Sequence, residues 1–189
     1  VMFMKIYNTL SHKEEVFIPW EEGKVSFYTC GPTVYHYAHI GNMRNYIGHD
    51  ILDKTLRFIG FDVTRCMNIT DVGHLTSDSD SGDDKMVASA KKEHKSVLDI
   101  ASFYTDAFFK DFDALNCKRP EIVSNATDNI EEYIKIITKL LEDGYAYKAG
   151  GNVYFDTSKL KDYYVLTNHK EDDMVVGARE SVEYDASKK

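Results

Sequence analysis

The order of hydrophobic and polar positions predicts a strand, a helix and a second strand in the first third of the chain. Residues 24–30 (KVSFYTC) are aromatic or β-branched and stop at Gly31-Pro32, which is typical of a buried strand. Apolar residues then recur at helical spacing over residues 43–59, and Gly60 ends that helix. Residues 61–69 (FDVTRCMNI) form the next strand. This order predicts a βαβ unit with parallel strands and a right-handed crossover.

Two more helices and a hairpin are predicted further along. Helical periodicity returns over residues 97–115. A third helix has Thr127 as its N-cap and ends at Gly144. Residues 145–157 (YAYKAGGNVYFDT) alternate aromatic residues around Gly150-Gly151, which predicts a hairpin.

Each predicted helix carries an apolar face. In the first helix this face is a ridge of Met43, Ile47, Ile51 and Thr55, widened by Leu52, Leu56 and Ile59. In the second it holds Leu98, Ala101, Tyr104, Thr105, Phe108 and Phe112. In the third it holds Ile130, Ile134, Ile137 and Leu141. Such faces predict packing on a sheet or on another helix.

Other segments are polar and carry weaker signals. Ser, Asp and Gly dominate residues 77–84, which predicts a mobile acidic loop. Residues 162–189 are polar, with one weak strand expected around 182–184, and the chain stops at YDASKK without a closing element. The βαβ unit also lacks the further strands of an open parallel sheet. We therefore expect an α/β fold that is the first half of a Rossmann-like parallel sheet with flanking helices.

Composition narrows the class of protein. The 189 residues are 43% hydrophobic, enough for one well-packed domain, or one domain and a small appendage. No apolar run approaches the ~20 residues of a membrane span, and the N-terminal stretch turns polar too soon for a secretion signal. A net charge of −8 argues against a broad nucleic-acid-coating surface. Cys30, Cys66 and Cys117 are odd in number and widely spaced, which favours a reducing cytoplasm over a disulfide framework. Cys66, in a strand, and Cys117, near the end of a helix, are most simply packing residues.

The chemistry is concentrated in residues 30–42 (CGPTVYHYAHIGN), which run from the end of a strand into the start of a helix. Ligands of open α/β sheets bind at that edge, and a helix start favours phosphate. Gly41 would allow close approach of a nucleotide, and His39 could donate a hydrogen bond to a phosphate oxygen. On spacing alone, the alternative that His36 and His39 are ordinary loop residues is favoured.

The stretch as a whole resembles the cysteinyl-tRNA synthetase family of class I aminoacyl-tRNA synthetases. The matching segments are YTCGPTVYHYAHIGN, RNYIGHDILDKTLRFIGFDVTRCMNITDVG, ALN…RP…AT and GYAY…GNVYFDTSK, in that order. His39-Ile40-Gly41-Asn42 stands where the class has its His-Ile-Gly-His signature. The resemblance covers nearly the whole chain.

The resemblance implies an ATP-dependent ligase that forms cysteinyl-adenylate and passes cysteine to tRNA(Cys). Cys30 would be the first ligand of a Zn²⁺ ion that selects the substrate thiolate. Gly31 and Thr33 would face cysteine. His39, Gly41 and Asn42 would hold ATP with its Mg²⁺. The family further implies a cytoplasmic protein that acts as a monomer and does not bind membranes.

The chain departs from the family in two ways. Asn42 replaces the second histidine of the signature, and we expect only a modestly lower ATP affinity or rate than with histidine. The family chain is also more than twice as long. The remaining zinc ligands, the Lys-Met-Ser-Lys-Ser loop and the anticodon-reading domain would lie beyond this chain. We expect residues 1–119 to form the first half of the catalytic domain and 120–189 to begin the connective insertion. The chain alone should neither bind zinc tightly nor charge tRNA.

Several alternatives stay open. Cys30, His36 and His39 have the spacing of a weak local metal cluster, and residues 78–89 are a poor match to a calcium loop. His74 could line the site, and Asp71 could orient its loop or reach ribose. Lys91, Lys92 and Lys95 could touch RNA but are more typical of a solvated face. The function itself has two competitors: a related cysteine–amino-sugar ligase and a non-catalytic binding module.

Overall fold

The protein is described here by a computed structural model that covers residues 4–72 and 96–166. The chain divides into two compact units. Among the described residues, the first unit comprises residue 4, residues 17–72 and residues 96–128, and the second comprises residues 5–16 and 129–166. The predicted acidic loop, His74, the three lysines and the weak strand at 182–184 lie outside the described residues.

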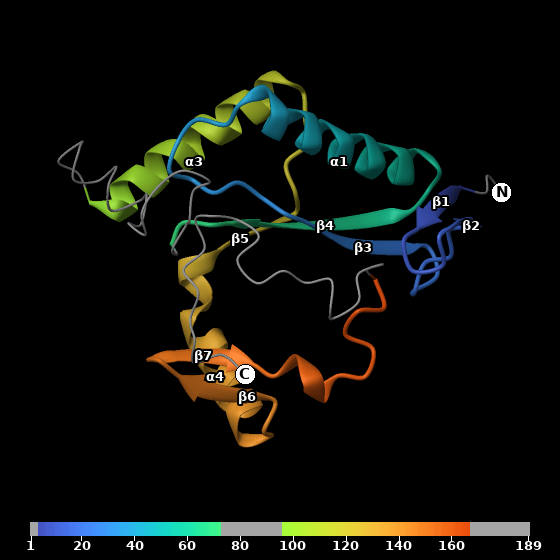
Figure 1. Cartoon of the computed structure of the whole chain (residues 1–189). Coiled ribbons are helices and arrows are strands. Elements are labelled where there is room, and N and C mark those ends of the chain that lie inside the picture. The colour runs from blue at the N-terminus through green and yellow to red at the C-terminus, as the bar shows by residue number, and fades with distance from the viewer. Residues whose placement is uncertain (1–3, 73–95, 167–189) are drawn as a thin grey trace. The chain divides into compact units, whose positions relative to one another are not determined.

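A parallel sheet forms the centre of the first unit (Figure 1). It consists of β3 (Lys24–Thr29), β4 (Asp62–Ile69) and β5 (Ile122–Asn125) in the order β3-β4-β5. Lys24 of β3 pairs with Asp62, and Cys66 of β4 pairs with Ile122, both in parallel register. The α/β class and the parallel βαβ unit are therefore confirmed.

The expectation that no further strand joins the βαβ unit is wrong, because β5 adds a third parallel strand. Its four residues, IVSN, come two positions after Pro120 and are too few to show a period of their own. The proposed domain boundary at 119/120 stays a prediction, and β5 falls just after it.

Helix α1 (Ile40–Phe58) connects β3 to β4, and it begins inside residues 30–42, the stretch that was predicted to run into the start of a helix. Its end is as predicted: Gly60 has φ +105°, and the N–H groups of Gly60 and Phe61 donate to the carbonyl oxygens of Arg57 and Leu56. Its buried face holds Met43, Tyr46, Asp50, Asp53 and Leu56.

The predicted ridge of α1 is wrong at Ile51, which is 60% exposed, and at Thr55, which is also exposed. The physical reason is that Asp50 and Asp53 are buried with charged partners. The buried face of α1 therefore contains two acidic residues, and apolar periodicity alone does not identify such a face.

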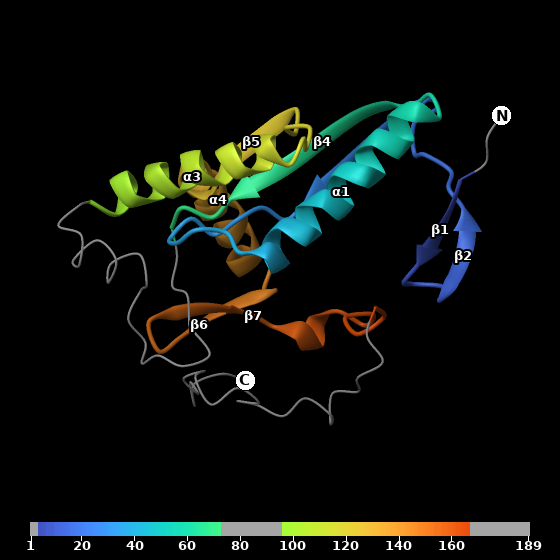
Figure 2. The ribbon, with the colours of Figure 1, turned by 90° about the horizontal axis from the view of Figure 1, so that it is seen from above.

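Helix α3 (Val97–Ala114) lies on the same face of the sheet as α1 (Figures 1 and 2). Ile100, Ala101, Phe108 and Phe112 are buried, whereas Leu98 is 64% exposed, so the predicted face is wrong at that position. The two helices and the sheet share one core, which consists of Val34, Met43, Tyr46, Met67, Ile69, Ala101, Phe108, Phe112 and Cys117. The packing role predicted for Cys117 is confirmed.

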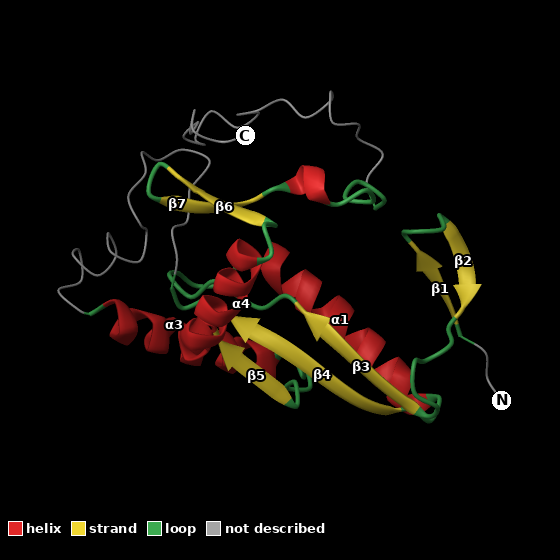
Figure 3. Cartoon of the chain, turned by 90° about the horizontal axis from the view of Figure 1, so that it is seen from below, coloured by secondary structure: helices red, strands yellow, loops and turns green. Residues whose placement is uncertain are grey.

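The second unit consists of short elements. Strands β1 (Lys5–Asn8) and β2 (Lys13–Val16) form an antiparallel hairpin that the sequence pattern did not predict. Helix α4 (Ile130–Glu142) packs on β6 (Ala146–Ala149), which pairs with β7 (Asn152–Phe155), as Figure 3 shows. This second hairpin is confirmed.

The ends of α4 match the prediction only in part. Gly144 has φ +76° and closes its C-terminal end, as expected. The N-cap is Asn129 rather than Thr127, because a short 3-10 helix (Ala126–Asn129) comes first. The hydroxyl of Thr127 is used elsewhere, since it donates to Asp71 at 2.5 Å. The last short turn is a second 3-10 helix, Thr157–Lys159.

Candidate active site at the start of α1

The turn from β3 to α1 runs parallel to the backbone that continues beyond β4. The N–H of Val34 donates to the Thr70 carbonyl oxygen at 3.1 Å, and the N–H of Thr70 donates to the Pro32 carbonyl oxygen at 3.0 Å. Thr33 and Thr70 form an isolated parallel bridge. Residues 31–34 are thus fixed at the carboxyl end of the sheet, the edge at which open α/β folds bind ligands.

Gly31 lies against the backbone of β4. Its N–H donates to Oδ1 of Asn68 at 2.8 Å. A Cβ atom at this position would stand 1.7 Å from the Asn68 carbonyl oxygen and 2.8 Å from Cγ of Met67. No side chain fits there, so glycine is a steric requirement of this turn.

His39 is the N-cap of α1. Its Nδ1 accepts the N–H groups of Gly41 at 3.0 Å and Asn42 at 3.4 Å, and Oδ1 of Asn42 accepts the His39 N–H at 3.1 Å. This is a capping box in which the histidine ring takes the place of the usual hydroxyl. A nitrogen that accepts N–H groups carries no proton, so the ring proton is on Nε2, which faces away from the cap as a donor.

The capping box changes one expectation about the phosphate site. A helix start favours phosphate because its first N–H groups are unpaired, but here the ring of His39 accepts the N–H groups of Gly41 and Asn42. The donor that remains on this residue is Nε2–H. A phosphate at this point would therefore meet the imidazole before it met the first turn of the helix.

A pocket of about 230 Å³ opens over this turn. It brings together four of the six predicted site residues, namely Gly31, Thr33, His39 and Asn42. Val34, Tyr46 and Phe108 belong to the core and also contribute to its wall, and the rest of its lining is Pro32, Tyr35, His36 and Ala38. Cys30 and Gly41 are not part of the lining.

Cys30 lies beside this pocket rather than in it. Burial, and then the negative charge of the Cys30 thiolate, raise the pKa of the Tyr46 hydroxyl to about 12. In the sequence, Cys30 directly precedes Gly31, which lines the pocket. Cys30 is exposed and its Sγ is 3.9 Å from the Gly31 carbonyl oxygen.

The described residues do not by themselves fit a zinc site. Across residues 4–72 and 96–166, no three His, Cys, Asp or Glu side chains gather as metal ligands. The possible cluster of Cys30, His36 and His39 is not formed, since Nδ1 of His36 lies 2.7 Å from the Tyr37 carbonyl oxygen and Nδ1 of His39 caps α1. A four-ligand zinc site would need further ligands in addition to Cys30.

Asp71 holds the segment that follows β5. Its side chain is buried, and its two oxygens accept the backbone N–H of Thr127 at 3.0 Å and the Thr127 hydroxyl. These contacts give Asp71 a role that was not predicted, namely to hold the segment after β5, and the predicted orientation of its own loop and contact with ribose stay predictions.

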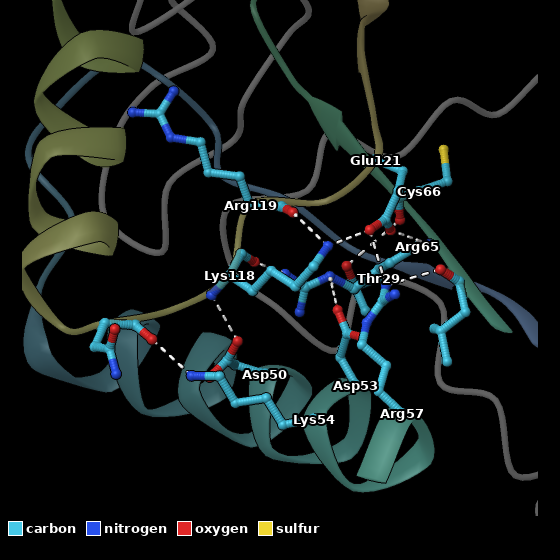
Figure 4. A network of polar contacts seen from close by, with 12 residues as sticks. Thr29, Asp50, Asp53, Lys54, Arg57, Arg65, Cys66, Lys118, Arg119 and Glu121 are labelled. Carbon is cyan, nitrogen blue, oxygen red and sulfur yellow. Dashed lines mark hydrogen bonds and ion pairs between the residues drawn. The ribbon is translucent and has the colours of Figure 1, made fainter. Parts of the chain in front are cut away.

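The sequence pattern missed a network of buried and half-buried charges between α1, β4 and the segment before β5 (Figure 4). Asp53 and Arg65 are 0% and 1% exposed, and Nε of Arg65 stands 3.5 Å from Oδ2 of Asp53. Arg57 donates to Oδ1 of Asp53 at 2.5 Å and to Oε1 of Glu121 at 2.8 Å. These contacts join α1, β4 and the segment before β5.

A second part of the network joins α1 to residues 116–118, at the start of the segment that precedes β5. Oδ1 of Asp50 accepts the N–H of Lys118 at 2.7 Å, and Oδ2 pairs with Nζ of Lys54 at 2.6 Å. Lys54 also donates to the Asn116 carbonyl oxygen at 2.7 Å. The signal that could have revealed the network is Asp50 and Asp53, spaced three apart on the buried side of a helix, with Lys54 and Arg57 each four residues later.

Glu121 of this network has a strongly lowered pKa. Burial alone would raise its pKa, but hydrogen bonds from the Lys118 ammonium and from backbone N–H groups, that of Arg65 among them, outweigh burial and lower the pKa to about 2. The Arg65 N–H donates to Oε2 at 2.8 Å. The carboxylate is therefore charged in the folded protein through the neutral range.

Comparison with known proteins identifies the family. The family described as "tRNA synthetases class I (C) catalytic domain" matches residues 16–189. The chain belongs to this family. The family resemblance noted in the sequence is thereby confirmed, and the capped helix start with its pocket lies inside the matched region.

Individual relatives of this class I synthetase chain are named Cysteine--tRNA ligase. One from Treponema denticola is 55% identical over 100% of the chain and 38% of the relative. One from Treponema pallidum is 48% identical over 100% of the chain and 37% of the relative, and one from Zymomonas mobilis is 50% identical over 87% and 32%. The chain thus spans about a third of the length of these relatives. Within the described ranges, no helix has both the length and the apolar character for a membrane span.

Proposed function

We propose that this class I synthetase chain supplies part of the adenylate-forming site of a cysteine–tRNA ligase. Such an enzyme joins cysteine to ATP as cysteinyl-adenylate, releases diphosphate, and transfers cysteine to tRNA(Cys). The observation that carries the proposal is the position of His39. Its ring caps α1 beyond the carboxyl end of β3, in one pocket with Gly31 and Thr33.

In this proposal His39 acts on the phosphate that reacts. The cysteine carboxylate attacks the α-phosphorus of ATP, the bond to the β-phosphate breaks, and diphosphate leaves. Charge grows on the phosphate oxygens in the transition state, and a fixed donor stabilises it. Nε2–H of His39 is such a donor, because the cap on Nδ1 holds both the tautomer and the ring orientation.

The other predicted site residues take the roles that the family resemblance implies, although Cys30 and Gly41 do not line the pocket. Gly31 and Thr33 would face cysteine from the turn over β4, and Gly41 and Asn42 would hold ATP at the first turn of α1. Mg²⁺ would accompany ATP, and zinc binding at Cys30 would need ligands from outside the described residues.

Asn42 is predicted to support the site mainly through the cap. In Asn42→Ala the acceptor for the His39 N–H is lost, which should cost about 1 kcal/mol in free energy of unfolding and raise the KM for ATP. Asn42→His restores the class signature and should raise ATP affinity or rate only modestly. Urea unfolding and ATP-dependent kinetics on the complete gene product measure both. An unchanged rate of adenylate formation in Asn42→Ala would remove any role in phosphate binding.

The tRNA ligase is preferred over the related cysteine–amino-sugar ligase because the relatives reported above are named Cysteine--tRNA ligase. We further propose a cytoplasmic monomer. All three cysteines are free, as in proteins of reducing compartments.

The test is ATP–diphosphate exchange by the complete gene product. The proposal predicts exchange that depends on cysteine and that serine does not support, followed by charging of tRNA(Cys). Exchange with ligation to an amino-sugar instead of tRNA would favour the other ligase. Absence of cysteine-dependent exchange would leave only a binding module.

A further inference from the structure

We propose that Asn68 is a positioning residue that holds the cysteine side of this site in shape. The inference rests on the proposed function and adds to it a residue that does not line the pocket. Asn68 is on β4, next to the last residue of the strand, and the Gly31 turn passes directly over it.

The carboxamide of Asn68 makes three hydrogen bonds, two to the end of β3 and the turn after it and one to Thr70 just beyond β4. Oδ1 accepts the Gly31 N–H at 2.8 Å and the Tyr28 hydroxyl at 2.6 Å. Nδ2 donates to the hydroxyl of Thr70 at 3.0 Å. The orientation of the amide is not arbitrary, because a backbone N–H can only donate and so must meet the oxygen.

These bonds tie the end of β3 to the end of β4 on both sides of Cys30. Tyr28 precedes the cysteine by two residues, and Gly31 follows it directly. The backbone of Asn68 also excludes any side chain at Gly31. The side chain and the backbone of this one residue thus both determine how closely the turn approaches β4. Thr33, on the pocket wall, is bridged to Thr70, which the amide of Asn68 also holds.

The ATP side of the pocket has a separate support. His39, Gly41 and Asn42 hold one another through the capping box. No bond of that box involves Asn68. Loss of the Asn68 side chain should therefore weaken cysteine binding and leave ATP binding unchanged. A general loss of stability would affect the binding of both substrates.

The experiment measures ATP–diphosphate exchange by the complete gene product, with cysteine and ATP varied in turn. In Asn68→Ala the Gly31 N–H and the Tyr28 hydroxyl lose their acceptor, and the KM for cysteine should rise about tenfold. The KM for ATP should change less than about twofold, because the capping box is intact.

A matched control is Thr64→Ala. Thr64 lies on the same face of β4, four residues before Asn68 and away from the turn, and its replacement should leave both KM values unchanged. If Asn68→Ala fails to fold, Tyr28→Phe provides the test, since it removes one donor to Oδ1 and keeps the ring. It should raise the KM for cysteine by about two- to threefold.

The outcomes are distinct. A rise confined to the KM for cysteine supports the positioning role. Equal rises in both KM values, or no change in either, overturn it while leaving the ligase proposal intact. If the wild-type protein shows no cysteine-dependent exchange, the proposed function fails and this inference fails with it.

Discussion

At the scale of single residues, the candidate site depends on two unusual positions. Gly31 is pressed against a strand backbone, and His39 uses its ring as a helix cap. In both cases a residue that binds or faces substrate in the proposal also has a structural task. The structural task explains why the local geometry is fixed before any ligand arrives.

The Gly31 position allows a sharp test. In Gly31→Ala the new methyl group would meet the Asn68 carbonyl oxygen at 1.7 Å, so the turn must move. We expect a loss of about 2–4 kcal/mol in free energy of unfolding, in the range of overpacked or strained sites. Urea unfolding of the complete gene product measures it.

The control is Gly48→Ala in α1, where nothing lies within 4 Å of the added Cβ. Alanine in a helix interior should be neutral or stabilising by about 0.5–1 kcal/mol. Equal unfolding energies for Gly31→Ala and wild type would show that the close approach is absent in solution.

At the scale of elements, buried charges join α1, β4 and the segment before β5. Buried ion pairs are not in themselves strong evidence for stability, but removal of one partner leaves an uncompensated charge. A substitution that removes one charged residue of the network should therefore destabilise the protein, even if the intact network adds little net stability.

Glu121 gives the network a dependence on pH. Its pKa is lowered from 4.5 to about 2 in the folded state, so its stabilising effect is complete above about pH 4.5 and is lost as the pH falls toward 2. Glu121→Gln should lower the free energy of unfolding by about 1–2 kcal/mol at neutral pH, after allowance for its partial exposure. The difference from wild type should shrink to nothing near pH 2.

Urea unfolding across the acid range measures this effect. The exposed residue Glu22, in the same unit, is the matched control, and Glu22→Gln should follow the wild-type curve. If Glu121→Gln keeps a constant deficit down to about pH 2, the lost stability does not come from the charge of this carboxylate.

The elements also show what could be predicted from the sequence. β3, β4, α3 and the Gly150-Gly151 hairpin have a clear period or turn residues of their own and were found. β5 was missed because four residues carry no period, and the inner face of α1 was misassigned because Asp50 and Asp53 are buried by pairing with residues distant in sequence. At the site, the motif located His39 and its pocket, but the use of its ring as a cap depends on backbone geometry.

At the scale of the whole molecule, the chain spans 38% of its Treponema denticola relative, and its pocket of about 230 Å³ is small. Pockets that enclose ligands of drug size run to about 300–1,000 Å³. We therefore propose that the described residues supply only part of the site, since Cys30 is the single zinc ligand assigned among them and no three His, Cys, Asp or Glu side chains of the described residues gather as metal ligands.

The 189-residue chain expressed alone should therefore not charge tRNA(Cys), even with zinc added. Aminoacylation assays compare it with the complete gene product at equal concentration, with circular dichroism to show that the short chain is folded. Turnover above background by the short chain would contradict this expectation.

The most direct test of the central claim separates the two tasks of His39. Asparagine is among the best N-caps, so His39→Asn should keep the free energy of unfolding within about 0.5 kcal/mol of wild type. It lacks the Nε2–H donor, so cysteine-dependent ATP–diphosphate exchange by the complete gene product should fall about 100- to 1,000-fold. If His39→Asn is as stable as wild type and exchanges at the wild-type rate, His39 is a cap alone and the proposed chemistry at this pocket is wrong.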